Sequence, residues 1–123
     1  MPQREDYLIR LIQQAFDVLR RLRARLMGDP LEADEVVRGA RDAQAELLGP
    51  LFGAMTVVDA DTAVGLMRDR ERLEAWVELM RLEAEALRVA GDAAGADTVA
   101  RRADAVVGAC DRLLEPATEY WTR

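Results

Sequence analysis

The chain has 123 residues, the size of a single domain able to bury about two-thirds of its unfolded surface. Half of the residues are apolar but only 5% are aromatic, a balance that favours helices rich in Ala and Leu. The net charge is −6, whereas contacts with nucleic-acid phosphates need a basic surface, so we expect no nucleic-acid partner.

The absence of several residue types excludes some kinds of catalytic site. Lys, His, Ser and Asn are absent, so the chain has no imidazole base and lacks two common nucleophiles. Cys110 is single and cannot form an intramolecular disulfide. The N-terminus lacks the pattern of a signal peptide, and no apolar run approaches the roughly 20 residues of a membrane span. These features predict a cytoplasmic protein that does not bind membranes.

The first predicted helix covers Glu5 to Met27. Its apolar positions step by three and four residues, at Leu8, Ile12, Ala15, Leu19, Leu22 and Leu26. Tyr7, Ile9 and Phe16 widen this arc in the first half, whereas four arginines crowd the second half. Residues 1–28 carry a charge of +3 and residues 29–115 a charge of −9, so this helix is expected to attract the rest of the chain.

The phrase GDPLEADEVVRGARDA follows, starting at Gly28. We expect Gly28 to adopt the left-handed conformation that closes a helix, Asp29 to cap the next helix and Pro30 to occupy its first position. The second helix is predicted from Pro30 to Leu48, where Gly49 and Pro50 end it.

Residues 49–69 are predicted to be an irregular connector followed by a short helix. Glycine, proline and β-branched residues interrupt the helical repeat of apolar positions here. Three apolar side chains are expected to fill the core: Leu51, Phe52 and Met55. Asp59 has the position of an N-cap for a helix from Ala60 to about Asp69. Leu66 and Met67 are expected to supply its apolar contacts.

The helix predicted from Arg70 to Ala90 has two apolar faces. One carries Leu73, Trp76, Val77, Met80, Ala84 and Leu87, and the other carries Ala75, Leu79, Leu82, Ala86 and Val89. Such a helix is either sandwiched between neighbours or leaves one side for a partner.

A second phrase, GDAAGADTVARRADA, starts at Gly91 and closes this helix. Asp92 or Asp97 can cap a last helix from about Ala94 to Leu114, which Pro116 ends. Tyr120 and Trp121 stand in the tail, where they are expected to fold back on the domain or to anchor a partner.

The repeated phrase is interpreted as the elbow of a helical hairpin. In both copies small residues follow the glycine at equal spacing, Ala33 and Ala40 in the first, Ala96 and Ala103 in the second. Residues seven apart share a helix face, so these alanines allow the preceding helix to approach closely. The predicted fold is all-α with about five helices in a single domain, 1–123. It comprises a hairpin at 5–48, the connector and short helix at 49–69, a hairpin at 70–115 and a tail at 116–123.

Both hairpins resemble the tetratricopeptide repeat, in which helix pairs join through a glycine-containing turn. The first-helix signature and the closing proline of that repeat are absent, and the two glycines lie 63 residues apart. The opening REDYLIRLIQQ, together with the elbows, also resembles an uncharacterised family of small bacterial helical proteins. The resemblance implies an all-helical fold and no known activity.

The strongest enzymatic hypothesis rests on an acidic stripe formed by Glu71, Glu74, Glu78 and Glu85. All-helical nucleotide pyrophosphohydrolases hold magnesium with a Glu-x-x-Glu and a following Glu-x-x-Asp, and hard cations prefer such oxygens. The last helix lacks the second half, because its acids Asp97, Asp104 and Asp111 have no glutamate three positions before them. A solvated helix face is the simpler interpretation, and Cys110 fits the apolar pattern as a buried filler.

The leading hypothesis is a non-enzymatic interaction or scaffold domain without cofactors, which binds another protein or forms a homodimer. The alternative is a metal-dependent hydrolase using the glutamate stripe, and a pocket between hairpins for a small apolar ligand is a third. The candidate interface residues are Tyr7, Ile9, Phe16, Leu79, Leu82 and Trp121.

Overall fold

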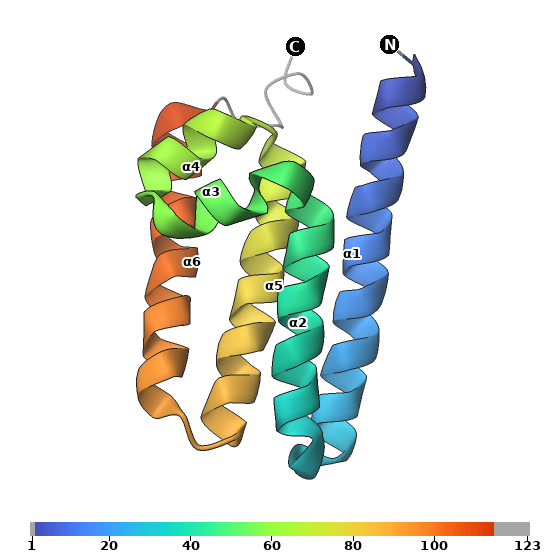
Figure 1. Cartoon of the computed structure of the whole chain (residues 1–123), viewed down its shortest axis with the longest axis vertical. Helices are drawn as coiled ribbons and strands as arrows, with labels where there is room; N and C mark the ends of the chain where they lie inside the picture. Colours follow the sequence, from blue (N-terminus) through green and yellow to red (C-terminus); the bar gives the residue numbers. More distant parts are fainter. Residues whose placement is uncertain (1, 115–123) are drawn as a thin grey trace.

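The computed structural model describes residues 2–114, with side chains from residue 6 onward. This part of the chain is all-α: α1 spans Pro2–Gly28, α2 Ala33–Leu48, α3 Phe52–Val57, α4 Ala60–Met67, α5 Arg70–Val89 and α6 Ala93–Leu113 (Figure 1). Short 3-10 turns, Pro30–Glu32 and Gly49–Leu51, precede α2 and α3. The predicted all-helical class is therefore confirmed, while Tyr120 and Trp121 lie outside the described residues.

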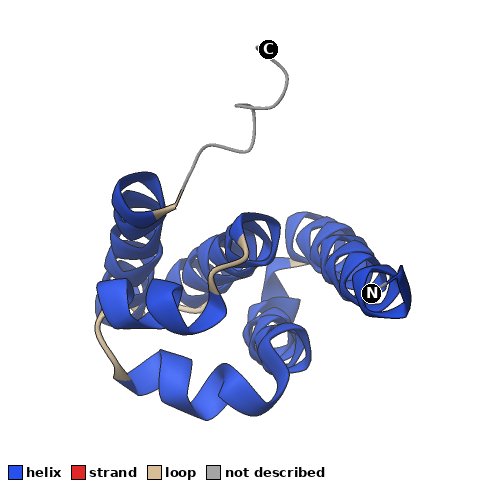
Figure 2. Cartoon of the chain, turned by 90° about the horizontal axis from the view of Figure 1, so that it is seen from above, coloured by secondary structure: helices blue, strands red, loops and turns tan. Residues whose placement is uncertain are grey.

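Two antiparallel hairpins, α1–α2 and α5–α6, pack with α5 at the centre. Helix α5 contacts α1, α2 and α6, and the view from above shows α5 between α6 and α1 with α2 beside it (Figure 2). Helices α3 and α4 cross one end of the bundle and connect α2 to α5, and α4 packs on α6. Helix α1 is an outer helix, in contact with α2 and α5.

The core forms around α5 because both of its apolar faces are covered. Leu73, Trp76, Leu79 and Leu82 are each at most 1% exposed. Helix α5 is therefore sandwiched between neighbouring helices and does not leave an apolar face for a partner. Leu79 and Leu82 are thus interior residues, and their assignment to a candidate interface was wrong, because neighbouring helices occupy both sides of α5.

Four aspartates begin the helical segments by capping them. Each accepts a hydrogen bond from a backbone N–H that has no partner within the helix: Asp29 from Leu31, Asp59 from Thr62, Asp69 from Arg72 and Asp92 from Gly95. Of the two candidates for the α6 cap, Asp92 takes the role. Asp97 pairs with Arg88 across the α5–α6 hairpin instead.

The two Gly-Asp elbows close differently. Gly91 has a φ of 96°, and the N–H groups of Gly91 and Asp92 bond back to α5, as the left-handed closure requires. Gly28 remains within α1 without a positive φ, so its predicted left-handed conformation was wrong. The Asp29 N–H continues the helical pattern by bonding to the Arg25 carbonyl, and Pro30 then starts the 3-10 turn directly.

The small residues of both elbows are buried, as predicted. Ala33, Ala40, Ala96 and Ala103 are at most 3% exposed. Gly39 reveals how close the first hairpin is, since an added Cβ would lie 2.9 Å from a methyl carbon of Leu22. Small side chains on the second helix therefore set the distance between the helices.

The connector is helical, which corrects the irregular segment predicted there. Leu51 and Met55 lie one turn apart on the same side, and Met55 is fully buried while Leu51 and Phe52 pack against the core. Burial of this apolar side favours a helical turn despite the breakers, and α3 ends at Val57, within the β-branched run.

Helix α4 is also shorter than predicted and buries different residues. It ends at Met67, where Arg68 takes a left-handed φ of 53° and Asp69 already caps α5. Its fully buried residues are Ala63 and Val64. Leu66 is 45% exposed and so does not supply the predicted contact, whereas Met67 packs against the core.

Within residues 2–114, none of the helices combines the length and the apolar character that crossing a bilayer requires.

Candidate functional site

The acidic stripe of α5 does not gather into a cation site, because arginines lie between its carboxylates and those of α6. Arg70 is 3.8 Å from Glu74 on its own helix and 3.6 Å from Asp111 on α6. Arg81 likewise lies 3.3 Å from Glu78 and 3.6 Å from Asp104.

Among the described residues, no three carboxylate or thiol groups converge as ligands for a metal ion. A magnesium site needs several oxygens about 2.1 Å from one point. Guanidinium groups between the two acidic rows already supply positive charge there. The geometry therefore favours a row of cross-helix ion pairs.

Cys110 is buried on the inner side of α6, as its apolar pattern predicted. Removal of the thiol from water raises its pKa, an effect that the nearby positive charge of Arg70 only partly offsets. Because the thiolate is the reactive form, a raised pKa and 4% exposure make Cys110 a filler of the core and a poor nucleophile.

The candidate interface residues on α1 lie on different sides of the helix. Tyr7 is 59% exposed and Ile9 52% exposed, whereas Phe16 is half-buried against the core. At 100° per residue, Tyr7 and Ile9 point about 160° apart. Phe16 lies on the side of Ile9, over the groove that also contains Val77 and Val107. Trp121 lies outside the described residues.

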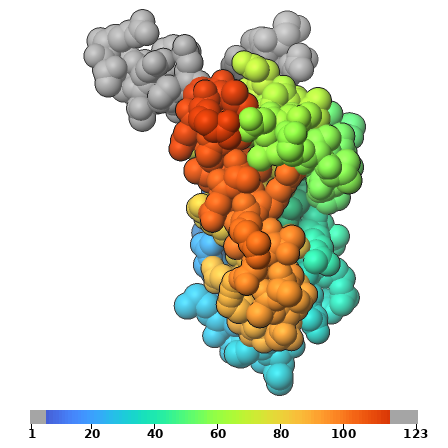
Figure 3. Space-filling view, turned by 90° about the vertical axis from the view of Figure 1, so that its left-hand side faces the viewer, coloured from blue at the N-terminus to red at the C-terminus, as the bar shows by residue number. Residues whose placement is uncertain are grey.

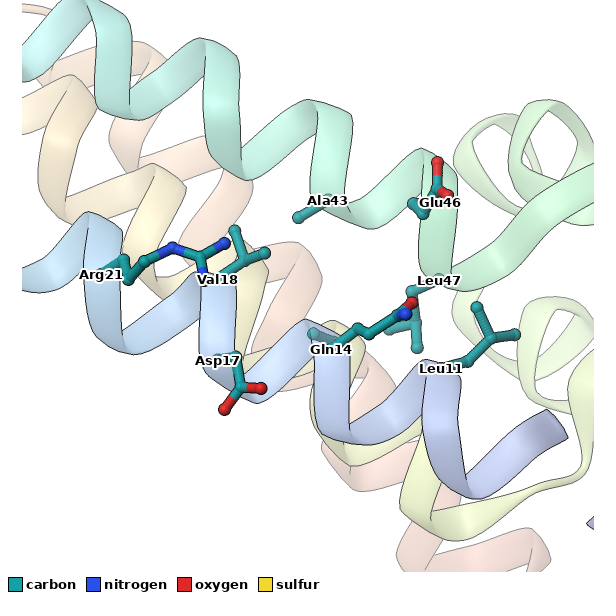
Figure 4. A pocket seen from close by; sticks show the side chains of 9 residues that line it. Leu11, Gln14, Asp17, Val18, Arg21, Ala43, Glu46 and Leu47 are labelled. Carbon is teal, nitrogen blue, oxygen red and sulfur yellow. The ribbon is translucent and has the colours of Figure 1, made fainter. Parts of the chain in front are cut away.

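The opposite side of α1 borders a groove of about 270 Å³ between α1 and α2 (Figure 4). Leu11 and Val18 line it from α1, and Ala43 and Leu47 line it from α2. Tyr7 belongs to the same face of α1 as Leu11 and Val18, because these positions are separated by four and seven residues. Exposed apolar surface thus borders α1 on both flanks.

Between these flanks runs an exposed polar stripe, the α1 outer stripe, which consists of Asp6, Arg10, Gln13, Asp17 and Arg21. These residues fall within about 80° of arc on the helix. The Asp17 carboxylate points away from α2 (Figure 4) and pairs with Arg20 one turn along. The stripe therefore faces solvent along most of α1.

A buried polar cluster lies on the other face of α5, where sequence periodicity predicted only apolar contacts. The Glu83 carboxylate accepts hydrogen bonds from Gln44 at 2.7 Å and from Arg41 at 2.8 Å, and the Trp76 indole N–H donates to Gln44 at 3.1 Å. Glu83 and Gln44 are 6% and 4% exposed. Every member has a partner, so the cluster links α2 and α5 without an unsatisfied polar atom.

The sequence did contain a signal for this cluster. Glu83 stands three residues after Met80 and four before Leu87, which places its carboxylate inside the apolar stripe of α5. Gln44 has the corresponding place in α2, three residues before Leu47. A polar residue inside an apolar stripe indicates a buried hydrogen-bonded pair, although its partner cannot be read from spacing.

Arg102 of α6 completes the surroundings of Trp76. Its guanidinium carbon lies 5.9 Å from the centre of the indole ring, and one N–H donates to the Met55 carbonyl at 2.5 Å. The arrangement joins α6 to α3 over the central tryptophan and contributes a cation–π contact.

Comparison with known proteins gives no assignment: no family model, no curated protein sequence and no solved structure matches the chain. The resemblances seen in the REDYLIRLIQQ opening and in the elbows remain predictions. Function must therefore be inferred from the surfaces and clusters of the chain itself.

Proposed function

We propose that the protein is a non-enzymatic helical interaction domain that pairs with a second copy of itself through the α1 outer stripe. The carrying observation is the order of charges along this stripe, which reads acidic, basic, neutral, acidic, basic at Asp6, Arg10, Gln13, Asp17 and Arg21.

This order is self-complementary when two copies of α1 run antiparallel. A register that places Asp6 opposite Arg21 of the second copy also places Arg10 opposite Asp17. The twofold axis then passes beside Gln13, and every charged contact occurs twice. Twofold pairs of this type are the commonest protein assemblies. A parallel pair in the same register would instead place like charges together.

The flanks of the stripe supply the apolar contacts that a stable pair needs. Exposed ion pairs contribute about 0–1 kcal/mol each, so charges alone set the register more than the affinity. Ile9 on one flank and Tyr7 and Val18 on the other are available for burial. The twofold axis brings like flanks together, so the same antiparallel register places Tyr7 near Val18 of the second copy and Ile9 near Phe16 of the second copy.

A charge-swap series on the full chain tests this proposal. We expect Asp17→Arg to dissociate the pair, because it places two like charges together at two symmetry-related positions. We expect Arg10→Asp combined with Asp17→Arg to restore the pair, because the swap re-creates both contacts. Sedimentation velocity over a concentration series measures the outcome.

Glu85→Arg, an exposed reversal on α5 that changes the net charge equally, is the matched control and should leave the association unchanged. A wild-type monomer at all accessible concentrations would contradict the proposal. So would an Asp17→Arg variant that still pairs, or a double variant that stays dissociated while folded.

The hydrolase alternative finds less support in the geometry. Its glutamates Glu74 and Glu78 are each within ion-pair distance of an arginine, and these arginines also approach the carboxylates of α6. Calorimetry with magnesium would detect a cation site on this face directly.

A further inference from the structure

A trough lies on the side of the bundle away from the groove that contains Val107. Helices α2 and α6 both pack on α5 and hardly contact each other, so α5 forms the floor between them. Residues at the end of α3 line one end of this trough together with residues of α2, α5 and α6. Figure 3 shows α6 in front, with α3 and α4 beside its upper half.

At this end the trough contains a pocket of about 370 Å³. This volume is within the range of roughly 300–1,000 Å³ typical of small-molecule sites. Its lining is mainly apolar, and the apolar residues come from α5, α6 and the end of α3: Val57, Val58, Trp76, Met80 and Val99. Val57 is 82% exposed, so an apolar side chain stands in contact with solvent at the pocket.

Two charged side chains line the pocket, and they differ in whether an ion pair balances their charge. Glu83 lines it, but its two oxygens already accept from Gln44 and Arg41, and Arg41 balances its charge. Arg102 lines it as well, is only partly exposed, and makes no ion pair within the described part of the chain. Of its five N–H donors, one is used by the Met55 carbonyl.

Asp59 is the acidic group of α4 that lies toward Arg102. Hydrogen bonds from Thr62 lower the pKa of Asp59, and the charge of Arg102 adds to this effect. However, the Asp59 carboxylate caps α4 and is not within ion-pair distance of the guanidinium. Arg102 therefore presents a positive charge with donors to spare beside an apolar cavity.

We propose that this pocket binds a small amphipathic carboxylate, whose acid group pairs with Arg102 and whose apolar body lies against Val57, Val99 and Met80. A guanidinium matches a carboxylate through two parallel N–H donors, and a partly desolvated setting strengthens the pair. Contact with the indole ring fixes the arginine in place, so little side-chain freedom is lost on binding. The compensated Glu83 does not repel the ligand.

Calorimetry of the full chain with octanoate, and with 1-octanol as a neutral molecule of equal chain length, tests the site. We expect octanoate to bind and Arg102→Gln to weaken it by about tenfold or more, which is the loss expected for one charged hydrogen-bonded pair. Arg101→Gln is the matched control: Arg101 is the exposed neighbour on α6, and its removal should not change the affinity.

Arg102 also holds α3, so a second variant protects the test from a failure to fold. Val57→Glu adds a negative charge at an exposed position of the same pocket and should weaken octanoate while leaving the fold intact. Absence of octanoate binding to the wild type at millimolar concentration overturns the proposal. Equal affinity of the wild type and either variant, or equal affinity for octanoate and 1-octanol, does the same. The site is independent of α1, so the dissociated Asp17→Arg variant should bind octanoate as the wild type does.

Discussion

At the scale of single residues, Glu83 shows how one polar side chain specifies packing between helices. Its carboxylate is buried among Trp76, Gln44 and Arg41 and joins α5 to α2 through hydrogen bonds of 2.7 and 2.8 Å. An apolar residue of similar size would pack at this position but could not fix which side chain of α2 faces it. The cluster thereby adds directionality to an interface that apolar contacts alone leave free to slide.

Glu83→Gln is expected to lower the free energy of unfolding by about 1–3 kcal/mol, because an amide N–H₂ then faces a donor that had a carboxylate partner. Glu85→Gln, two residues along on the exposed face of α5, should change it by less than about 0.5 kcal/mol. Urea denaturation of both variants at low protein concentration measures the difference. Equal stability of the two variants would show that the cluster does not hold the hairpins together.

Asp59 illustrates a residue whose effect depends on pH. Hydrogen bonds from Thr62 to the α4 cap hold its pKa below the ordinary value of 3.8. A carboxyl group with a lowered folded pKa stabilises the fold fully above its unfolded pKa and loses this contribution as the pH falls through the folded pKa.

We therefore expect the wild type to lose more stability than Asp59→Asn between about pH 5 and pH 2, because the amide cap is neutral throughout this range. Asp59→Ala lacks a cap at every pH and should be less stable than the wild type at the upper end. Thermal unfolding followed by circular dichroism across this range checks both. Parallel curves for the wild type and Asp59→Asn would exclude the cap as the source.

At the scale of elements, the glycines that begin the two copies of the elbow phrase have different backbone conformations. Gly91 has a positive φ that an L side chain adopts only with strain, whereas Gly28 is an ordinary position in the last turn of α1. An added Cβ meets nothing within 4 Å at either position, so backbone conformation alone distinguishes them.

Gly91→Ala is expected to cost about 1–2 kcal/mol in the free energy of unfolding, the penalty of a left-handed conformation. Gly28→Ala should cost nothing and can add up to about 0.5–1 kcal/mol, since alanine is the better helix former. Chemical denaturation of the two variants side by side measures this. A similar loss for both would mean that Gly28 also leaves the right-handed region in solution.

The elements also show how far periodicity predicts this fold. Long amphipathic helices are predicted well, because a repeat over many turns outweighs local propensity: α1, α5 and α6 differ from expectation by a few residues at most. The region of α3 and α4 was predicted less well. Its helices have only six and eight residues, and contact with the rest of the bundle decides whether such short segments are helical.

At the scale of the whole molecule, charged residues are arranged differently on the α5–α6 hairpin and on the α1 outer stripe. Three acidic residues of α6, Asp97, Asp104 and Asp111, pair with arginines of α5 across the hairpin, while the α1 outer stripe carries alternating charges toward solvent. The proposed pairing should therefore weaken as salt is added, because exposed charges are screened over about 10 Å at 0.1 M salt. Binding of octanoate should be affected less, because Arg102 is only partly exposed and apolar contacts carry part of the affinity.

The sequence by itself determined the helical class, the two hairpins and most of the caps, because these follow from local spacing and from backbone N–H groups that need a partner. Only the tertiary structure decided that α5 is covered on both faces, which removed Leu79 and Leu82 from the candidate interface. It alone also placed Arg102 beside Trp76 and Glu83 beside Gln44. The physical reason is that periodicity shows which face of a helix is apolar, whereas the neighbour that covers this face depends on how distant helices pack together.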